Sequence, residues 1–105
     1  MESHLLFKEI TTLLQNNGGE NLVTVDLCNK SGVADYIIIV TGTSNRHSIT
    51  LAEKSITLLK KHNIKNIRVD GLQVANWIAI DCGKLVLHIF LEEVREYYAI
   101  EKIWQ

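Results

Sequence analysis

The chain has no proline and only two cysteines among its 105 residues. Two cysteines, Cys28 and Cys82, are too few for a disulfide framework, which predicts a reducing cytoplasm in which both serve as small buried apolar groups. No apolar run approaches the about 20 residues that span a bilayer, so we expect no membrane segment. The N-terminus lacks an apolar signal segment, so neither a secretory nor a transit peptide is expected.

Charge of one sign is also lacking, since 11 Lys and Arg oppose 12 Asp and Glu for a formal net charge of −1. This balance gives no general attraction for nucleic acid or an anionic membrane, so we expect no direct, sequence-independent binding to RNA, although a local basic patch is compatible with it. We expect no direct, sequence-specific nucleic-acid partner either. The hydrophobic share of 47% is that of a globular protein, and the length predicts a single domain over residues 1–105.

An apolar run at residues 36–40 organises the rest of the chain. Four of its five residues are β-branched and no polar residue interrupts them, so the run predicts a central strand buried on both faces. A polar turn follows at residues 41–44. Thr43, Ser44 or Asn45 can cap the helix that begins there, with Arg46 and His47 in its first turn.

Hydrophobic periodicity predicts the other elements: helices over residues 3–16, 45–62 and 92–98, and strands over 22–27 and 67–70. Strands 36–40 and 67–70 flank a helix at the length of a right-handed crossover, so we expect them to be parallel. Expected packing residues are Ile49, Ala52, Ile56, Leu58 and Leu59 in the second helix and Val94, Tyr97 and Tyr98 in the third. Near the C-terminus, Trp104 is expected to dock on the body or to meet another chain.

Residues 76–91 predict a hairpin that turns at Cys82 and Gly83, with Asp81 opposite Lys84 and Trp77 opposite His88. Alternation gives one wholly apolar face, which consists of Ile78, Ile80, Leu85, Leu87 and Ile89. The other face is mixed and carries Trp77, Ala79, Asp81, Lys84, Val86, His88 and Phe90. An exposed tryptophan on a rigid sheet is typical of an interface anchor, whereas a fourth element covering this face would make Trp77 part of the core.

The catalytic alternatives are weak. A strand, a Gly-containing turn and a helix start can hold a phosphate, but residues 41–47 match neither a Walker loop nor a dinucleotide fingerprint. A nucleotidyl transferase needs paired carboxylates for metal ions, and Asp26, Asp70 and Asp81 are isolated. Ser44 and His47 are three residues apart, which favours capping over a catalytic triad. Asp35 is a candidate partner of the turn residues, Arg46 among them. We therefore predict a protein without catalytic residues, metal or cofactor.

Several motifs carry a family resemblance in combination. They are Ala34-Asp35-Tyr36, Thr41-Gly42-Thr43-Ser44 with Arg46-His47, then Gly71, Trp77, Asp81, Gly83, Val86, His88, Arg95, Tyr98, Ile100, Glu101 and Trp104. With this spacing the sequence resembles the ribosomal silencing factor family, also called the Iojap family. The resemblance covers the chain from about residue 22 to residue 104. One position departs from it, because the family usually has an acid directly after Gly83, where this chain has Lys84.

The resemblance implies a small α/β fold, with a mixed five-stranded sheet, about three helices and a nucleotidyltransferase-like core that lacks catalytic acids. It also implies a translational repressor that binds the large ribosomal subunit through its universal ribosomal protein fourteen and blocks the small subunit. The same binding suits a large-subunit assembly factor, and a homodimer is expected off the ribosome. The implied binding residues are Trp77, Asp81, Lys84, Val86 and His88, while Thr43, Ser44, Arg46 and His47 form a structural turn or a secondary contact. A nucleotide-binding enzyme is the rival interpretation.

Overall fold

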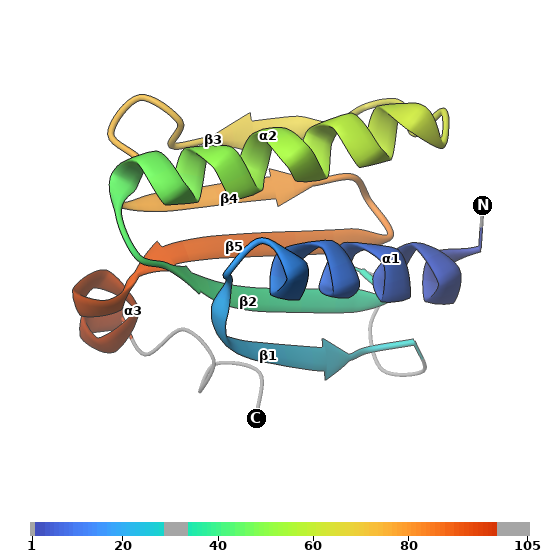
Figure 1. Ribbon diagram of the computed structural model, residues 1–105. Coiled ribbons are helices and arrows are strands. Elements are labelled where there is room, and N and C mark those ends of the chain that lie inside the picture. The colour runs from blue at the N-terminus through green and yellow to red at the C-terminus, as the bar shows by residue number, and fades with distance from the viewer. Residues whose placement is uncertain (1, 29–33, 99–105) are drawn as a thin grey trace.

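The computed structural model describes residues 2–28 and 34–98, which form a mixed sheet with helices on one face and at one end (Figure 1). In chain order the elements are α1 (Ser3–Asn16), β1 (Glu20–Asp26), β2 (Tyr36–Gly42), α2 (Asn45–Lys61), β3 (Arg68–Asp70), β4 (Trp77–Asp81), β5 (Leu85–Leu91) and α3 (Glu92–Tyr98). The described ranges thus contain five strands and three helices, which confirms the predicted α/β class.

The strands lie in the order β1-β2-β5-β4-β3. β2 and β5 are parallel neighbours, and the β1–β2, β4–β5 and β3–β4 pairs are antiparallel. These pairings make β2 and β3 run in the same direction, as the crossover length predicted. However, β5 and β4 lie between β2 and β3. The crossover therefore passes over the places of two strands, and β3 does not pair with β2. The segment after β2 therefore carries α2 over the sheet before β3 forms the edge.

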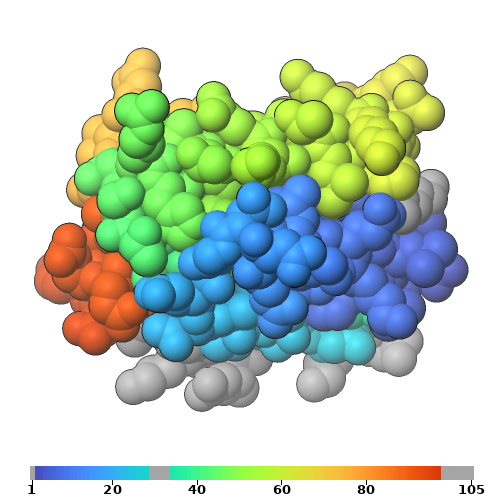
Figure 2. Space-filling model, viewed as in Figure 1, coloured from blue at the N-terminus to red at the C-terminus, as the bar shows by residue number. Residues whose placement is uncertain are grey.

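One face of the sheet is covered by α1 and α2, which form a continuous layer in the space-filling view (Figure 2). The core beneath them joins helix residues Leu6, Ile10, Leu14, Leu51 and Leu59 to the apolar face of the hairpin. Ile78, Ile80, Leu85, Leu87 and Ile89 are each at most 1% exposed, so the predicted apolar face is confirmed. The division of the hairpin into two faces is the same for turns that differ by two residues, because successive strand residues point to opposite faces.

β2 is an interior strand that lies between β1 and β5, and all seven of its residues are buried, as the unbroken apolar run predicted. Ile38 and Val40 face the helices, whereas Ile37 and Ile39 join a second apolar cluster on the opposite face with Leu27 and Phe90. This opposite face is called the outer face below. Its centre is apolar and buried, so the mixed character predicted for it is confined to β4, β5 and their turn.

The apolar stripe of α2 differs from the prediction. Ile49, Ile56 and Leu58 are only partly buried, while Leu51 and two serines, Ser48 and Ser55, are fully buried. At Ser48 the helix lies close to the end of β2, since a Cβ added at Gly42 would come within 2.1 Å of the Ser48 Oγ. A periodicity search that scores serine as polar therefore misplaces the centre of the stripe.

Three further expectations meet different outcomes. Tyr97 was expected to pack, but it is 82% exposed, and among the α3 side chains that the structure describes it is Arg95 that is buried. Cys28 was expected to be buried, but it lies exposed beyond the end of β1, while Cys82 is half-buried. Trp104 and the side chain of Tyr98 lie outside the described residues, so the expectations for them stay predictions.

Candidate functional site

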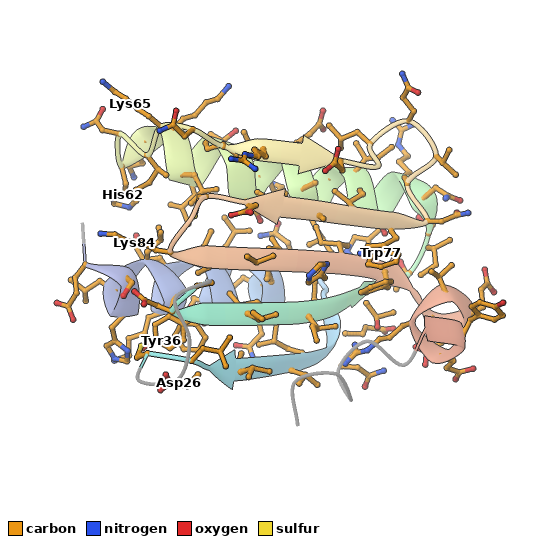
Figure 3. All side chains as sticks on the ribbon, turned by 180° about the vertical axis from the view of Figure 1, so that it is seen from behind. Asp26, Tyr36, His62, Lys65, Trp77 and Lys84 are labelled. Atoms are coloured by element: carbon orange, nitrogen blue, oxygen red, sulfur yellow. The ribbon has the colours of Figure 1, made fainter. Side chains whose placement is uncertain are left out.

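The outer face of the β4–β5 hairpin carries the predicted binding residues. The view from behind turns this face of the sheet toward the reader and labels Trp77 and Lys84 (Figure 3). The observed register pairs Trp77 with Phe90, Ala79 with His88 and Asp81 with Val86. The predicted pairs, Trp77 with His88 and Asp81 with Lys84, are therefore wrong by two residues. The turn is the reason: Cys82 N–H donates to the Leu85 carbonyl at 3.1 Å, so Gly83 and Lys84 alone form the turn. A shift of two leaves every side chain on its predicted face.

Trp77 nevertheless contacts His88, because the two residues are diagonal neighbours across the strands. The indole Nε1–H donates to Nδ1 of His88 at 3.0 Å. The indole ring also packs against Phe90 with a centroid distance of 4.8 Å, and His88 stacks on Phe90 at 5.9 Å. Trp77 and His88 are both half-buried. Trp77 is therefore neither a core residue nor a freely exposed one, and its ring is held by its neighbours on the face.

The environment of His88 opposes its protonation. Burial lowers the pKa of His88 below its ordinary value, and the carboxylate of Asp81 counteracts this only in part. The hydrogen bond acts in the same direction as burial, since the indole can only donate and so requires an unprotonated Nδ1. The neutral ring with its proton on Nε2 is the form that fits this geometry.

Asp81, Lys84 and Val86 do not surround Trp77. Asp81 lies four residues along β4, which at a strand rise of about 3.3 Å per residue is about 13 Å away. Its Oδ1 accepts the Gly83 N–H at 2.8 Å, so part of this carboxylate stabilises the turn. Lys84 is exposed in the turn, and Val86 pairs with Asp81. Trp77 therefore lies at the opposite end of the hairpin from Asp81 and Lys84, with His88 between them.

Exposed apolar side chains at the Trp77 end were missed by the sequence analysis. Leu72 and Val74 in the β3–β4 loop are 37% and 68% exposed, and Tyr97 on α3 is 82% exposed. The loop and the start of α3 are brought together because Leu91 N–H donates to the Asn76 carbonyl at 3.1 Å. No periodic signal finds these residues, since they lie in a loop and on a short helix.

The turn at residues 41–44 is held by internal hydrogen bonds. Ser44 caps α2 by accepting the His47 N–H at 3.0 Å, as predicted. His47 then bridges two segments: its Nδ1 accepts the Thr43 N–H at 2.9 Å, and its Nε2 donates to the Asn17 carbonyl at 2.8 Å. Asn45 Nδ2 donates to the Val74 carbonyl at 3.0 Å. These contacts support the structural role of Thr43, Ser44 and His47.

A hollow of about 490 Å³ lies at the carboxyl ends of β2 and β5, where the phosphate alternative would place a ligand. Besides the turn, it is lined by the carboxylates of Glu20, Glu92 and Glu93, which repel an anion. The Thr43 N–H is already bonded to His47. The proposed Asp35–Arg46 contact is wrong, because β2 separates the two residues and Asp35 N–H donates instead to the Lys84 carbonyl at 2.8 Å.

Arg95 is a buried polar residue that the motifs contained but whose role the sequence did not reveal. It is 6% exposed, and its Nη1 donates to the Asn21 carbonyl at 2.6 Å and to the Thr41 hydroxyl at 2.8 Å. These contacts join α3 to the ends of β1 and β2.

Two other kinds of site are absent from the described part of the chain. No group of three His, Cys, Asp or Glu residues there could hold a metal ion. None of the described helices combines the length and the apolar character of a membrane span.

Comparison with known proteins agrees with the motifs and the fold. The family model described as "Ribosomal silencing factor during starvation" matches residues 1–105, which confirms the resemblance. A ribosomal silencing factor from Haemophilus influenzae is 37% identical over 86 residues, covering 82% of this chain and 84% of that protein. A mouse protein named "Mitochondrial assembly of ribosomal large subunit protein 1" is 26% identical over 98 residues, covering 90% of this chain and 43% of that protein. A crystal structure of a Chromobacterium violaceum protein has a TM-score of 0.92 at 30% identity and covers 99% of this chain and 87% of that one.

Proposed function

Since the chain belongs to the ribosomal silencing factor family, we propose that it binds the large ribosomal subunit through the subunit's universal ribosomal protein fourteen and blocks the small subunit. The family is not a family of enzymes, so membership confirms the expectation of a regulator of translation without catalysis. The proposed mechanism is occlusion, in which a domain seated on the joining surface clashes with the incoming subunit and no bond is broken. The proposal also places the protein in the cytoplasm, as a homodimer when it is off the ribosome.

The outer face at the Trp77 end is the observation that carries the proposal. A half-buried indole held by its neighbours loses little side-chain entropy on binding, which is what an anchor residue requires. Val74, in the loop before β4, and Tyr97, on the helix after β5, are exposed apolar side chains in the segments that adjoin this end of the hairpin. Asp81 and Lys84 lie at the far end of the hairpin, where they supply charge at the rim rather than contacts around the anchor.

Sedimentation of purified large subunits with the protein tests the proposal. The wild type is expected to pellet with large subunits and to prevent the formation of joined ribosomes when small subunits are added. Trp77→Ala should cost about 2 kcal/mol of binding free energy or more, as interface anchors do. Leu5→Ala is the matched control, because Leu5 is an apolar side chain on α1 that is 51% exposed on the helix-covered face. Equal loss in both variants would overturn the assignment of the outer face.

Assembly of the large subunit is the second candidate, favoured by the name of the mouse relative. Such a factor would use the same face but would act before subunits mature. In the sedimentation assay it would bind the large subunit without preventing subunit joining. Depleting the protein would then accumulate immature large subunits, whereas loss of a silencing factor would leave their maturation unchanged and raise translation in nutrient-poor cells.

A further inference from the structure

The hydrogen bond between Trp77 and His88 joins two side chains of the proposed binding face. It runs from Nε1–H to Nδ1 over 3.0 Å and links β4 to β5 across the diagonal of the hairpin. The residue directly opposite His88 is Ala79, whose small side chain leaves the diagonal open. The backbone at Gly71 lies close to that of Trp77, since a Cβ on Gly71 would come within 2.1 Å of the Trp77 carbonyl oxygen.

The chemistry of the pair makes this contact depend on the charge of His88. An indole N–H is a donor only, so it needs a ring nitrogen with a free lone pair. Protonation of His88 converts Nδ1 into a donor, and two N–H groups then face each other. The bond is lost, and the indole keeps only its ring contacts, such as that with Phe90 at 4.8 Å.

We propose that His88 is a positioning residue for Trp77, whose neutral imidazole holds the indole in the orientation that binds the large subunit, so that binding weakens when His88 takes up a proton. The inference rests on the proposed function and deepens it, because it gives the anchor a supporting residue and the complex a sensitivity to acid. His88 need not touch the partner for this effect.

The surroundings of His88 support a transition on the acid side of neutrality. Burial lowers the pKa of His88, and Asp81 on β4 is the charged group that opposes this shift. On β5 its outer-face neighbours are Val86 and Phe90, and on β2 it pairs with Ile39. These neighbours carry no charge, so among the described residues packed beside His88 on this face the balance lies between burial and Asp81.

Three substitutions of His88 separate the effect of the hydrogen-bond acceptor at Nδ1 from the effects of side-chain size and polarity. His88→Asn places an amide oxygen where Nδ1 lies and cannot titrate, so it keeps the acceptor. His88→Gln places its oxygen one bond farther, near the position of Nε2, and His88→Leu offers no acceptor. Large-subunit binding is measured by sedimentation from about pH 8 to about pH 5.5. The asparagine variant also reports any effect of acid on the subunit itself.

At pH 8 the wild type and His88→Asn should bind within about twofold of each other. His88→Gln and His88→Leu should bind about three- to tenfold more weakly, the loss expected for one hydrogen bond. Acid should weaken the wild type to the level of His88→Leu and should leave His88→Asn unchanged. Equal binding by all four proteins at pH 8, while Trp77→Ala fails to bind, would overturn the positioning role and leave the proposed function standing.

A readout on the isolated protein keeps the two proposals apart. The indole Nε1–H resonance of Trp77, identified by its absence in Trp77→Phe, should move on acidification in the wild type and stay in place in His88→Asn. If the chemical shift of the Trp77 indole N–H does not change with pH in the wild type, the inference is overturned, whether or not the protein binds the large subunit. A resonance that moves, in a protein that does not pellet with large subunits at any pH, would overturn the proposed function and the binding role of His88 with it.

Discussion

A close approach of α2 to the end of β2 gives a direct test of the fold. Gly42 ends β2 beneath α2, and a Cβ built on it would lie 2.1 Å from the Ser48 Oγ and 3.1 Å from the Ser48 Cα. Both atoms belong to a fully buried residue, so neither can move into solvent. Gly42→Ala must therefore push α2 away from the sheet or distort the end of β2.

The magnitude follows from two opposing effects. Overpacking of this kind costs about 1–3 kcal/mol, and the reduced freedom of the unfolded chain with alanine returns about 0.4–1 kcal/mol. We expect Gly42→Ala to lower the free energy of unfolding by about 1 kcal/mol, measured by urea denaturation followed by circular dichroism. Ser48→Ala alone should raise stability by about 1 kcal/mol, because among the described residues its buried hydroxyl has no hydrogen-bond partner.

The variant that combines Gly42→Ala with Ser48→Ala tests whether the two residues are in contact. Ser48→Ala removes the oxygen at 2.1 Å, so it should recover more stability in the Gly42→Ala background than in the wild type, as expected for residues in contact. Gly83→Ala is the control, because its φ of +89° strains an alanine while no atom lies within 4 Å of the added Cβ, so Ser48→Ala should not rescue it. Additive effects of the two substitutions, or a Gly42→Ala protein as stable as the wild type, would show that α2 does not lie against Gly42.

Three other predictions follow from the same structure. Ile38→Ala, in the centre of the core, should cost about 2–5 kcal/mol of unfolding free energy in urea; a small loss would refute the packing of β2. Arg95→Met keeps most of the side-chain volume but removes the donors to Asn21 and Thr41, so thermal denaturation should show a loss of about 1–3 kcal/mol. Because His88 has a lowered pKa, the unfolded chain takes up its proton first; stability should fall as pH drops below about 6.5 toward the folded pKa, and His88→Asn should flatten that slope.

The sequence predicted the faces of the hairpin better than its register. Ile78 and Ile80 were assigned to the core because alternation depends only on parity, and parity is the same for turns that differ by two residues. The pairing of Trp77 depends on the turn itself, which is fixed by the Cys82–Leu85 bond. The predicted partners were wrong for that reason, although the face and the Trp77–His88 contact were right.

Contacts between distant segments were beyond the sequence. His47 reaches the carbonyl of Asn17, 30 positions earlier, and Arg95 reaches Thr41, 54 positions earlier. A single sequence shows that such residues are polar and in which element they lie, but their partners are chosen by the way the elements pack. The buried state of Arg95 was missed because arginine is rarely buried, and α3 is too short for a periodic signal.

The hydrogen bonds of the turn after β2 help to decide between a phosphate site at this turn and a protein-binding site on the outer face of the sheet. A phosphate site needs backbone donors that are free and surroundings that are not anionic. Here the Thr43 N–H is bonded to His47, the His47 N–H is bonded to Ser44, and Glu20, Glu92 and Glu93 line the adjacent hollow. The polar groups of this turn serve to join α1, α2 and the sheet. Because the described polar groups of the turn are used by the fold itself, we propose that binding uses the outer face instead, where the half-buried indole of Trp77 is held by His88.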